Sequence, residues 1–140
     1  MYLLDTNVLS ELIRRLPNPV VDARFRSNTG RLFTSVICLE EIRFGAMIAP
    51  PGNRFWERIS REVLPAVTVL PLDEATGRLA GDLRAEWKLN GTPVGYRDGL
   101  IAATAKALDF ILVTRNVRHF DHVQGLKVEN WFAPVGFGAR

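Results

Sequence analysis

Three acidic residues far apart in the sequence occupy unusual positions for a carboxylate. Asp5 follows an apolar run, Glu41 lies in an apolar row of a predicted helix, and Asp98 stands one turn before an apolar helical stripe. Carboxylates within about 4 Å of one another repel by roughly 1 kcal/mol in water and by up to about 4 kcal/mol near a protein surface. A hard divalent cation offsets this repulsion, and Mg²⁺ prefers one or two carboxylates with water and substrate phosphates. If the fold gathers these acids, they form a candidate metal site.

Each acid also has a simpler structural explanation. Asp5 could cap the following helix, although Thr6 or Asn7 could do so equally well. Glu41 could pair with an arginine at the edge of the apolar face. Asp98 lies in the first turn of its helix, where the helix dipole favours an acid by roughly 0.3 to 1 kcal/mol. These explanations account for the acids singly but less well for all three together.

The elements that must position the acids alternate between short apolar strands and amphipathic helices. We predict strands at 2–4, 32–34, 67–72, 110–113 and near 126–128, and helices at 6–13, 19–27, 36–48, 53–64, 74–88 and 96–108. The predicted caps of the second, third and fifth helices are Asn18, Ser35 and Asp73. Parallel neighbouring strands need crossover connections, so this order predicts a three-layer α/β/α fold around a central, mainly parallel sheet of about five strands.

Length and composition agree with one soluble domain spanning 1–140. The chain has 140 residues, of which 47% are hydrophobic and 24% charged, and its single cysteine excludes an intrachain disulfide. We recognise neither a membrane span nor a secretion signal and expect a cytoplasmic protein. The isoelectric point of about 9.5 is a weak indication of nucleic-acid binding, and a solvated basic surface explains it equally well.

Two polar turns are predicted at the same edge of the sheet. In open parallel sheets ligands bind beyond the carboxyl ends of the strands. Asp5 follows the first strand there, and Thr114, Arg115 and Asn116 follow the strand at 110–113.

At these residues the sequence resembles the PIN-domain ribonucleases, specifically the VapC and FitB-like toxins of bacterial toxin-antitoxin pairs. Five segments carry the resemblance in order: "YLLDTNVLSEL" from Tyr2, "LFTSVICLEEIRFG" from Leu32, "VLPLDE" from Val69, "GTPVGYRDGLIAATA" from Gly91 and "LVTRNVRHFD" from Leu112. Each segment alone is weakly specific, whereas five in register are highly specific.

The resemblance implies an endoribonuclease that depends on Mg²⁺ or Mn²⁺. Asp5, Glu41 and Asp98 match the acids of the family, and Thr6 and Thr114 match the hydroxyl residues that orient them. The fourth catalytic position, often an acid in relatives, is Asn116 here.

Two histidines and a fourth acid lie near that position. His119 stands where many relatives carry an Asp, which leaves the second metal position open, and Asp121 is a further acid in the same segment. The pKa of a histidine suits proton transfer, but an exposed histidine in a turn is more often incidental. His122 has the same low weight.

The implied chemistry is metal-assisted hydrolysis of an RNA phosphodiester. Asp5 and Asp98 would hold a cation that polarises the phosphate and lowers the pKa of the attacking water. Glu41 would position that water or a second ion. Arg97 and Arg115 could hold RNA phosphates, or each could form a surface salt bridge instead.

The resemblance also implies protein partners. Members of the family form homodimers and hetero-oligomers with a small antitoxin that carries a DNA-binding domain. Phe55, Trp56 and Ile59 offer an apolar strip for such a partner or for the dimer, although a role in the core explains them as well. Trp87 and Trp131 are equally ambiguous.

Two alternatives remain open. The first is a non-catalytic PIN-like nucleic-acid-binding module acting with an antitoxin or DNA-binding partner, which Asn116 and His119 make plausible. The second is phosphoryl transfer through an aspartyl nucleophile at Asp5. The absence of a second Asp two residues later, where Asn7 stands, counts against it.

Overall fold

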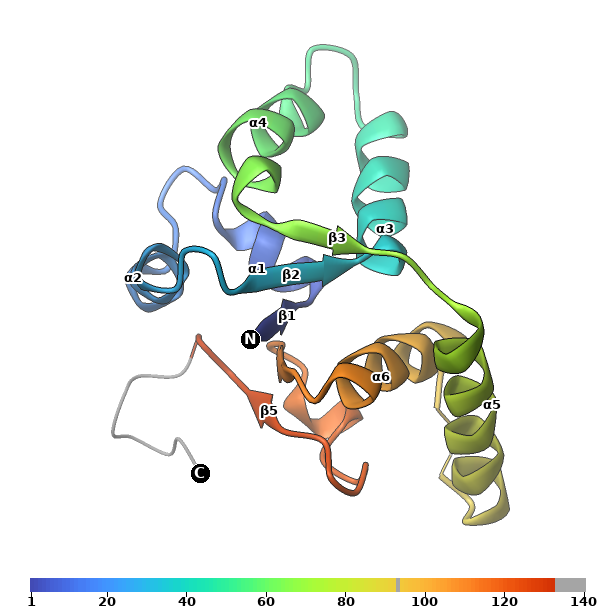
Figure 1. Ribbon diagram of the computed structural model, residues 1–140. Coiled ribbons are helices and arrows are strands. Elements are labelled where there is room, and N and C mark those ends of the chain that lie inside the picture. The colour runs from blue at the N-terminus through green and yellow to red at the C-terminus, as the bar shows by residue number, and fades with distance from the viewer. Residues whose placement is uncertain (93, 133–140) are drawn as a thin grey trace.

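The computed structural model describes residues 1–92 and 94–132. The expected single domain at 1–140 therefore includes a carboxyl-terminal segment and Pro93 that lie outside the described residues. Figure 1 shows the arrangement of the elements. The strands are β1 (Tyr2–Leu4), β2 (Leu32–Ser35), β3 (Thr68–Leu70), β4 (Ile111–Val113) and β5 (Val128–Glu129). The α-helices are α1 (Thr6–Glu11), α2 (Pro19–Ser27), α3 (Val36–Met47), α4 (Phe55–Glu62), α5 (Glu74–Leu89) and α6 (Tyr96–Leu108).

The five strands form one sheet in the order β3-β2-β1-β4-β5, and all four pairings are parallel. The chain builds outward from β1 through β2 to β3, then crosses to β4 on the other side of β1. The strand order therefore reverses between β1 and β4, the point where open parallel sheets bind ligands. The predicted α/β/α fold is confirmed.

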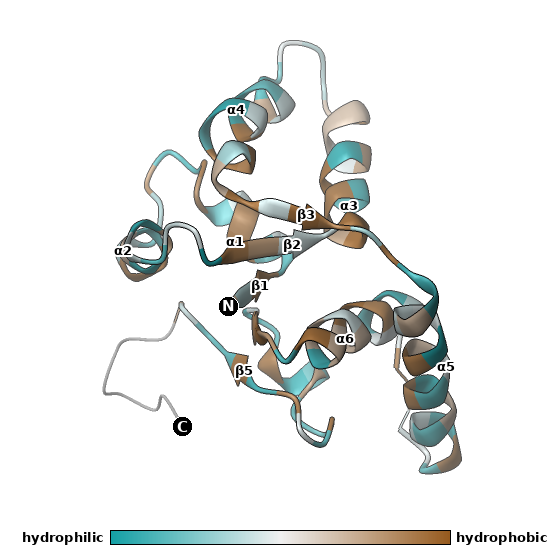
Figure 2. Cartoon of the chain, in the orientation of Figure 1, coloured by the Kyte–Doolittle hydropathy of each residue, from teal (hydrophilic) through white to brown (hydrophobic). Residues whose placement is uncertain are grey.

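Neighbouring residues of the central strands supply two separate cores because side chains alternate across a sheet. Leu3 and Leu112 face a core closed by α5 and α6, whereas Leu4 and Val113 face a second core closed by α1, α2 and α4. Figure 2 shows hydrophobic residues on β1 and β2 and, between polar ones, on α6. Both cores reach the carboxyl ends of the central strands, so both hold the rim of the sheet in place.

The tryptophans left open by the sequence belong to these cores. Trp87 and Trp131 are buried, and so is Ile59 of the expected apolar strip. Only Phe55 and Trp56 of that strip stay partly exposed. No helix among the described residues combines the length and the apolar character needed to cross a membrane.

Side-chain caps begin α1, α2, α3 and α5, and the sequence predicts the cap residue of the last three. Asn18, Ser35 and Asp73 each accept a hydrogen bond from a backbone N–H of the first turn of α2, α3 and α5. Of the three residues that could cap α1, the structure uses Asp5 and not Thr6 or Asn7. Strand β1 ends at Leu4 and α1 begins at Thr6, so Asp5 is the only residue between them.

Helix α1 is shorter than its hydrophobic pattern predicts. It ends at Glu11, and Leu12 and Ile13 follow in a turn. The buried Glu11 carboxylate accepts a hydrogen bond of 2.8 Å from the backbone N–H of Asn18. This bond draws the chain back toward α2 and explains the early end of the helix.

Candidate active site

Asp5 lies between the end of β1 and the start of α1, and its side chain is 1% exposed. Oδ1 accepts hydrogen bonds from the backbone N–H of Thr6, at 2.8 Å, and from the Cys38 thiol, at 3.7 Å. Oδ2 accepts one of 2.8 Å from the hydroxyl of Thr114, at the end of β4. The carboxylate is therefore both a cap and a fixed acceptor at the strand reversal point.

Glu41 comes to the same place from the second turn of α3. Its Oε1 accepts a hydrogen bond of 2.6 Å from the hydroxyl of Thr6, and its side chain is 40% exposed. The apolar row in which Glu41 lies is not the face that α3 buries. Phe44 and Ile48 of that row are exposed, and α3 buries Cys38 and Ile42 instead, because the helix meets the two cores through the adjacent row.

Asp98 lies in the first turn of α6, with its side chain 17% exposed. Its Oδ2 is 3.1 Å from Nδ1 of His119, in the turn beyond β4. His119 thus contacts a candidate metal ligand, a role that the sequence did not distinguish from an incidental one.

Arg97 joins the three acids. Its Nη2 contacts Oδ1 of Asp5, Nε lies 2.7 Å from Oε1 of Glu41, and Nη1 lies 3.0 Å from Oδ1 of Asp98. Burial alone would lower the pKa of the guanidinium. Asp5 and the hydrogen bonds to Asp5 and Glu41 outweigh burial, so the pKa of Arg97 is raised and its charge is permanent. We call Asp5, Glu41, Asp98 and Arg97 the acid cluster.

The sequence did not anticipate this position for Arg97. Its place beside Asp98 suggested a phosphate contact or a surface salt bridge, and the side chain is instead 30% exposed and paired with three carboxylates. The available signal was electrostatic: three converging acids require a cation, and Arg97 is the basic residue adjacent to one of them.

The buried Cys38 thiol also contacts the acid cluster through Asp5. Burial, and after it the charge of Asp5, raises the pKa of the Cys38 thiol to about 11.

The hydroxyl residues that were expected to orient the acids contact them. Thr6 bonds Glu41, and its hydroxyl also accepts a hydrogen bond of 3.2 Å from Arg97. Thr114 bonds Asp5 and accepts a hydrogen bond of 3.1 Å from the backbone N–H of Asn116. The Asn116 side chain is exposed beyond these contacts, and Asp121 is exposed as well.

The donor set fits a hard divalent cation in chemistry but not in its present spacing. Carboxylates on three different elements direct oxygens at one small volume, as Mg²⁺ and Mn²⁺ sites require. Within residues 1–92 and 94–132, however, no three Asp, Glu, His or Cys side chains lie close enough together to hold a metal ion. The guanidinium of Arg97 fills the volume where their oxygens meet.

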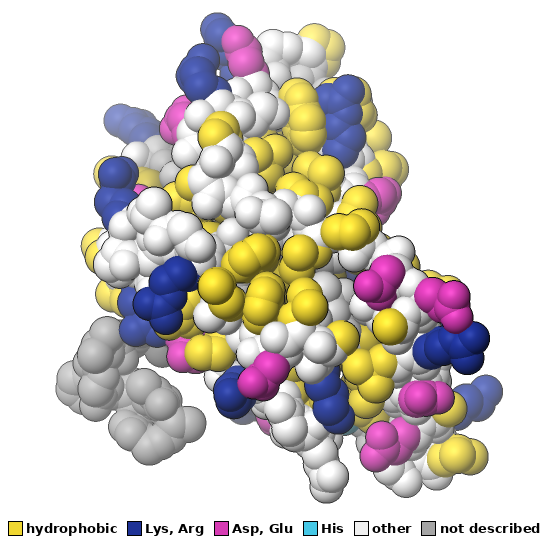
Figure 3. Space-filling model, in the orientation of Figure 1, with side chains coloured by type: hydrophobic (Ala, Val, Ile, Leu, Met, Phe, Trp, Pro, Cys, Tyr) yellow, Lys and Arg dark blue, Asp and Glu magenta, His cyan; other side chains and the backbone are white. Residues whose placement is uncertain are grey.

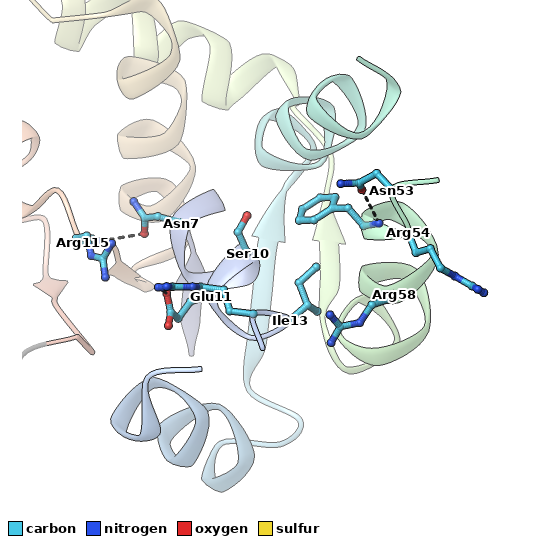
Figure 4. Close-up of a pocket in the computed structure, with 10 residues that line it drawn as sticks. Asn7, Ser10, Glu11, Ile13, Asn53, Arg54, Arg58 and Arg115 are labelled. Atoms are coloured by element: carbon cyan, nitrogen blue, oxygen red, sulfur yellow. Dashed lines mark hydrogen bonds and ion pairs between the residues drawn. The ribbon is translucent and has the colours of Figure 1, made fainter. Parts of the chain in front are cut away.

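A groove runs from the acid cluster between α1 and α4. It comprises a cavity of about 310 Å³ that includes Thr6 and Glu41, and a larger one of about 680 Å³. The two cavities share Ser10, Asn53 and Phe55. Figure 4 shows Asn7 hydrogen-bonded to the backbone of Arg115 at one end of the larger cavity, with Arg54 and Arg58 at the other.

Arginines line this groove, but most of them are neutralised. Arg14, Arg54 and Arg58 pair with Glu11, Glu57 and Glu62. Arg115 has no carboxylate partner among the described residues, and its guanidinium lies 3.9 Å from the ring centroid of Phe132. Arg115 is therefore the arginine of the groove whose charge is most available to an anion.

The geometry disfavours a phosphoryl-accepting role for Asp5. A nucleophile needs an oxygen that an incoming phosphorus can approach in line, and both oxygens of Asp5 are already engaged. The residue is also almost completely buried.

The comparisons with known proteins agree on one family. The family model for the PIN domain matches residues 2–126. The chain is 40% identical to the VapC ribonuclease Y4jK of Sinorhizobium fredii over 141 residues, covering 96% of this chain and 100% of that protein. It is 36% identical to the toxin FitB of Neisseria gonorrhoeae over 126 residues, covering 86% of this chain and 91% of that protein.

A solved structure extends the likeness to three dimensions. DNA-bound VapBC from Salmonella typhimurium superposes with a TM-score of 0.84 at 32% identity, covering 93% of this chain and 97% of that one. The fold and its rim of acids define a PIN domain, and the chain belongs to that family.

Proposed function

We propose that this PIN domain is an endoribonuclease that depends on Mg²⁺ or Mn²⁺ and acts as the toxin of a toxin-antitoxin pair. One observation carries the proposal: carboxylates from β1–α1, α3 and α6 converge on a single cation at the strand reversal point. The stabilisation that an acid gains at the start of a helix is smaller than the repulsion between neighbouring acids, so helix capping does not explain such convergence. The likeness to a protein named as a VapC ribonuclease supports RNA as the substrate.

Asp5, Glu41 and Asp98 would hold the metal. When bound, the ion would offset charge on the scissile phosphate and lower the pKa of a water molecule. Thr114 and the Thr6 backbone fix the direction of both Asp5 oxygens, while the Thr6 hydroxyl fixes Glu41. These bonds keep the acids oriented without a contribution from the substrate.

Two further residues would act on the RNA. His119 contacts Asp98 and is exposed to solvent, so it can exchange a proton at Nε2 with a leaving or attacking oxygen. Arg115 stands beside the acid cluster at the end of the groove and would hold a phosphate of the RNA strand. The side chain of Asn116 would contribute a neutral oxygen where relatives often carry an acid.

The proposed partners are an antitoxin with a DNA-binding domain and a second copy of this chain. The likeness to DNA-bound VapBC supports the first. Figure 3 shows hydrophobic side chains over β2, β3 and α3 on one face of the molecule. Val36, Phe44 and Met47 of α3 and Ile48 directly after it are exposed, which suits a surface that a protein partner covers.

The test is a paired cleavage assay on total RNA with wild-type protein and Asp98→Asn, each with Mg²⁺, with Mn²⁺ and with a chelator. We expect wild-type protein to cleave RNA only with a divalent cation, and Asp98→Asn to lose cleavage in every condition. Cleavage that survives the chelator, or that Asp98→Asn retains, would contradict the proposal.

The second candidate function is a non-catalytic PIN-like module that binds nucleic acid. The observation that favours it is the engagement of all three acids by Arg97. In that case purified protein binds RNA and the amount of intact RNA stays constant with either metal.

A further inference from the structure

Arg97 has the contacts of an internal cation rather than of an ordinary salt-bridge partner. Its guanidinium directs a different nitrogen at each of three carboxylates, which come from the β1–α1 turn, α3 and α6. Asp5 and Glu41 lie 92 and 56 positions away from it in the sequence. An arginine in an exposed salt bridge would contact one acid and remain solvated.

The charges of the acid cluster make this arrangement responsive to a second cation. Three formal negative charges face the single positive charge of Arg97, so the cluster stays negative. A divalent ion offsets more charge than a guanidinium, but the two would repel if both sat among the same oxygens. Because the guanidinium of Arg97 already contacts the carboxylate oxygens that a metal ion would need, we treat the arginine-paired state and the metal-bound state as alternatives.

The position of Arg97 allows its guanidinium to move away from the carboxylates. It is the second residue of α6, and its side chain is 30% exposed. Arginine has several rotatable bonds, so the guanidinium can turn to solvent or to a phosphate while the helix stays where it is. Tyr96, which precedes it, is exposed as well.

We propose that Arg97 is an internal counterion that holds the three carboxylates together in the metal-free protein and leaves the acid cluster when a divalent cation is bound. This inference rests on the proposed metal site. Metal binding then carries the cost of breaking the contacts of Arg97, so the resident arginine weakens metal affinity while it stabilises the metal-free fold. By linkage, the two effects have the same magnitude.

The experiment measures Mn²⁺ affinity by calorimetry and thermal unfolding with and without Mn²⁺, for wild type and Arg97→Gln. We expect the variant to bind Mn²⁺ about tenfold or more tightly, to unfold at a lower temperature without metal, and to recover much of that loss with Mn²⁺. Arg118→Gln is the matched control, because it removes an exposed positive charge nearby that makes none of the described contacts to the acids.

A second variant covers the case in which Arg97→Gln does not fold without metal. Arg97→Lys keeps the charge but offers one donor group for three carboxylates, so it should bind Mn²⁺ with an affinity above that of wild type. In wild-type protein the Nε–H signal of Arg97 in a nitrogen-proton NMR spectrum should be protected without metal and lose its protection on addition of Mg²⁺.

The outcomes separate this inference from the proposed function. Mn²⁺ affinity equal to or weaker than wild type in both Arg97 variants would overturn the counterion role and leave the metal site standing. Failure of wild type and variants alike to bind Mn²⁺ would overturn the metal site and this inference together.

Discussion

The hydroxyl of Thr114 donates a hydrogen bond of 2.8 Å to Oδ2 of Asp5, across 109 positions of the sequence. The bond joins the ends of β4 and β1 at the point where the strand order reverses. Both residues are buried, so water cannot replace the donor if Thr114 is lost.

Replacement of this donor should therefore cost both stability and activity. Thr114→Val keeps the shape of the side chain and removes the hydroxyl, and we expect the free energy of unfolding to fall by about 1.5 to 3 kcal/mol. Thr114→Ser keeps the donor and should recover most of the cleavage rate. Urea unfolding and RNA cleavage measure the two effects, and a fully active Thr114→Val protein would contradict them.

A substitution at Glu41 should lower RNA cleavage with little effect on the free energy of unfolding. Its carboxylate is 40% exposed, so Glu41→Gln should change the free energy of unfolding by less than about 1 kcal/mol. Cleavage should fall about 100-fold or more, since the lost charge belongs to the proposed metal site. Glu40→Gln, which changes an exposed neighbour, is the control and should keep wild-type cleavage.

The buried thiol of Cys38 predicts a dependence of stability on alkaline pH. Burial, helped by the charge of Asp5, raises its pKa from 9.0 to about 11. Because the folded pKa is the higher one, the folded protein holds this proton where the unfolded chain has lost it. The contribution of the thiol to stability is thus complete below pH 9 and declines between pH 9 and about 11.

The check is urea unfolding at pH 8, 9 and 10 in the presence of a chelator. The free energy of unfolding of wild type should fall faster than that of Cys38→Ala, by up to about 1.4 kcal/mol per pH unit above pH 9. Parallel curves for the two proteins would show that the thiol does not titrate as described.

Two glycines with opposite surroundings test the packing of α5 against α6. A Cβ added at Gly99 would lie 2.8 Å from Cγ of Arg84, whereas one added at Gly81 meets nothing within 4 Å. Gly99→Ala should lower the free energy of unfolding by about 1 kcal/mol, because overpacking outweighs the gain in helix propensity. Gly81→Ala should raise it by roughly 0.5 to 1 kcal/mol. Thermal unfolding compares them directly, and the same sign for both variants would refute the account.

The available charge of Arg115 predicts a specific change in RNA binding. In a Glu41→Gln background with a chelator present, which suppresses cleavage, Arg115→Gln should weaken binding to single-stranded RNA. The slope of log K against log salt concentration should become shallower by about 0.7. Arg78→Gln, on the exposed side of α5, controls for net charge. Fluorescence anisotropy at several salt concentrations gives the slopes, and equal slopes for Arg115→Gln and wild type would exclude a phosphate contact.

Much of the fold follows from local sequence. Apolar runs with β-branched residues locate the strands, and side chains such as Asn18 and Asp73 mark where helices begin. The ends of elements are less accessible, because they depend on distant contacts. Helix α1 stops at Glu11 since a buried carboxylate binds the N–H of Asn18, and no local pattern encodes that bond.

In the candidate site, too, some features follow from the sequence and others depend on contacts between distant residues. The rule for parallel sheets predicts that Asp5 and Thr114 share an edge, and they are hydrogen-bonded. The apolar row of α3 that carries Glu41 does not mark the buried face of the helix, because Phe44 of that row is exposed. The sequence left Arg97 open between a phosphate contact and a surface salt bridge, because its role depends on where three distant acids meet, and the spacing of residues along the chain does not show that.

The central position of β1 has a consequence for a cell that makes this protein. Asp5 is synthesised before its strand partner β4 and before the residues of α6. Thr114, which fixes Oδ2 of Asp5, follows 109 positions later. A nascent chain therefore cannot assemble the acid cluster and its support until translation has passed Thr114.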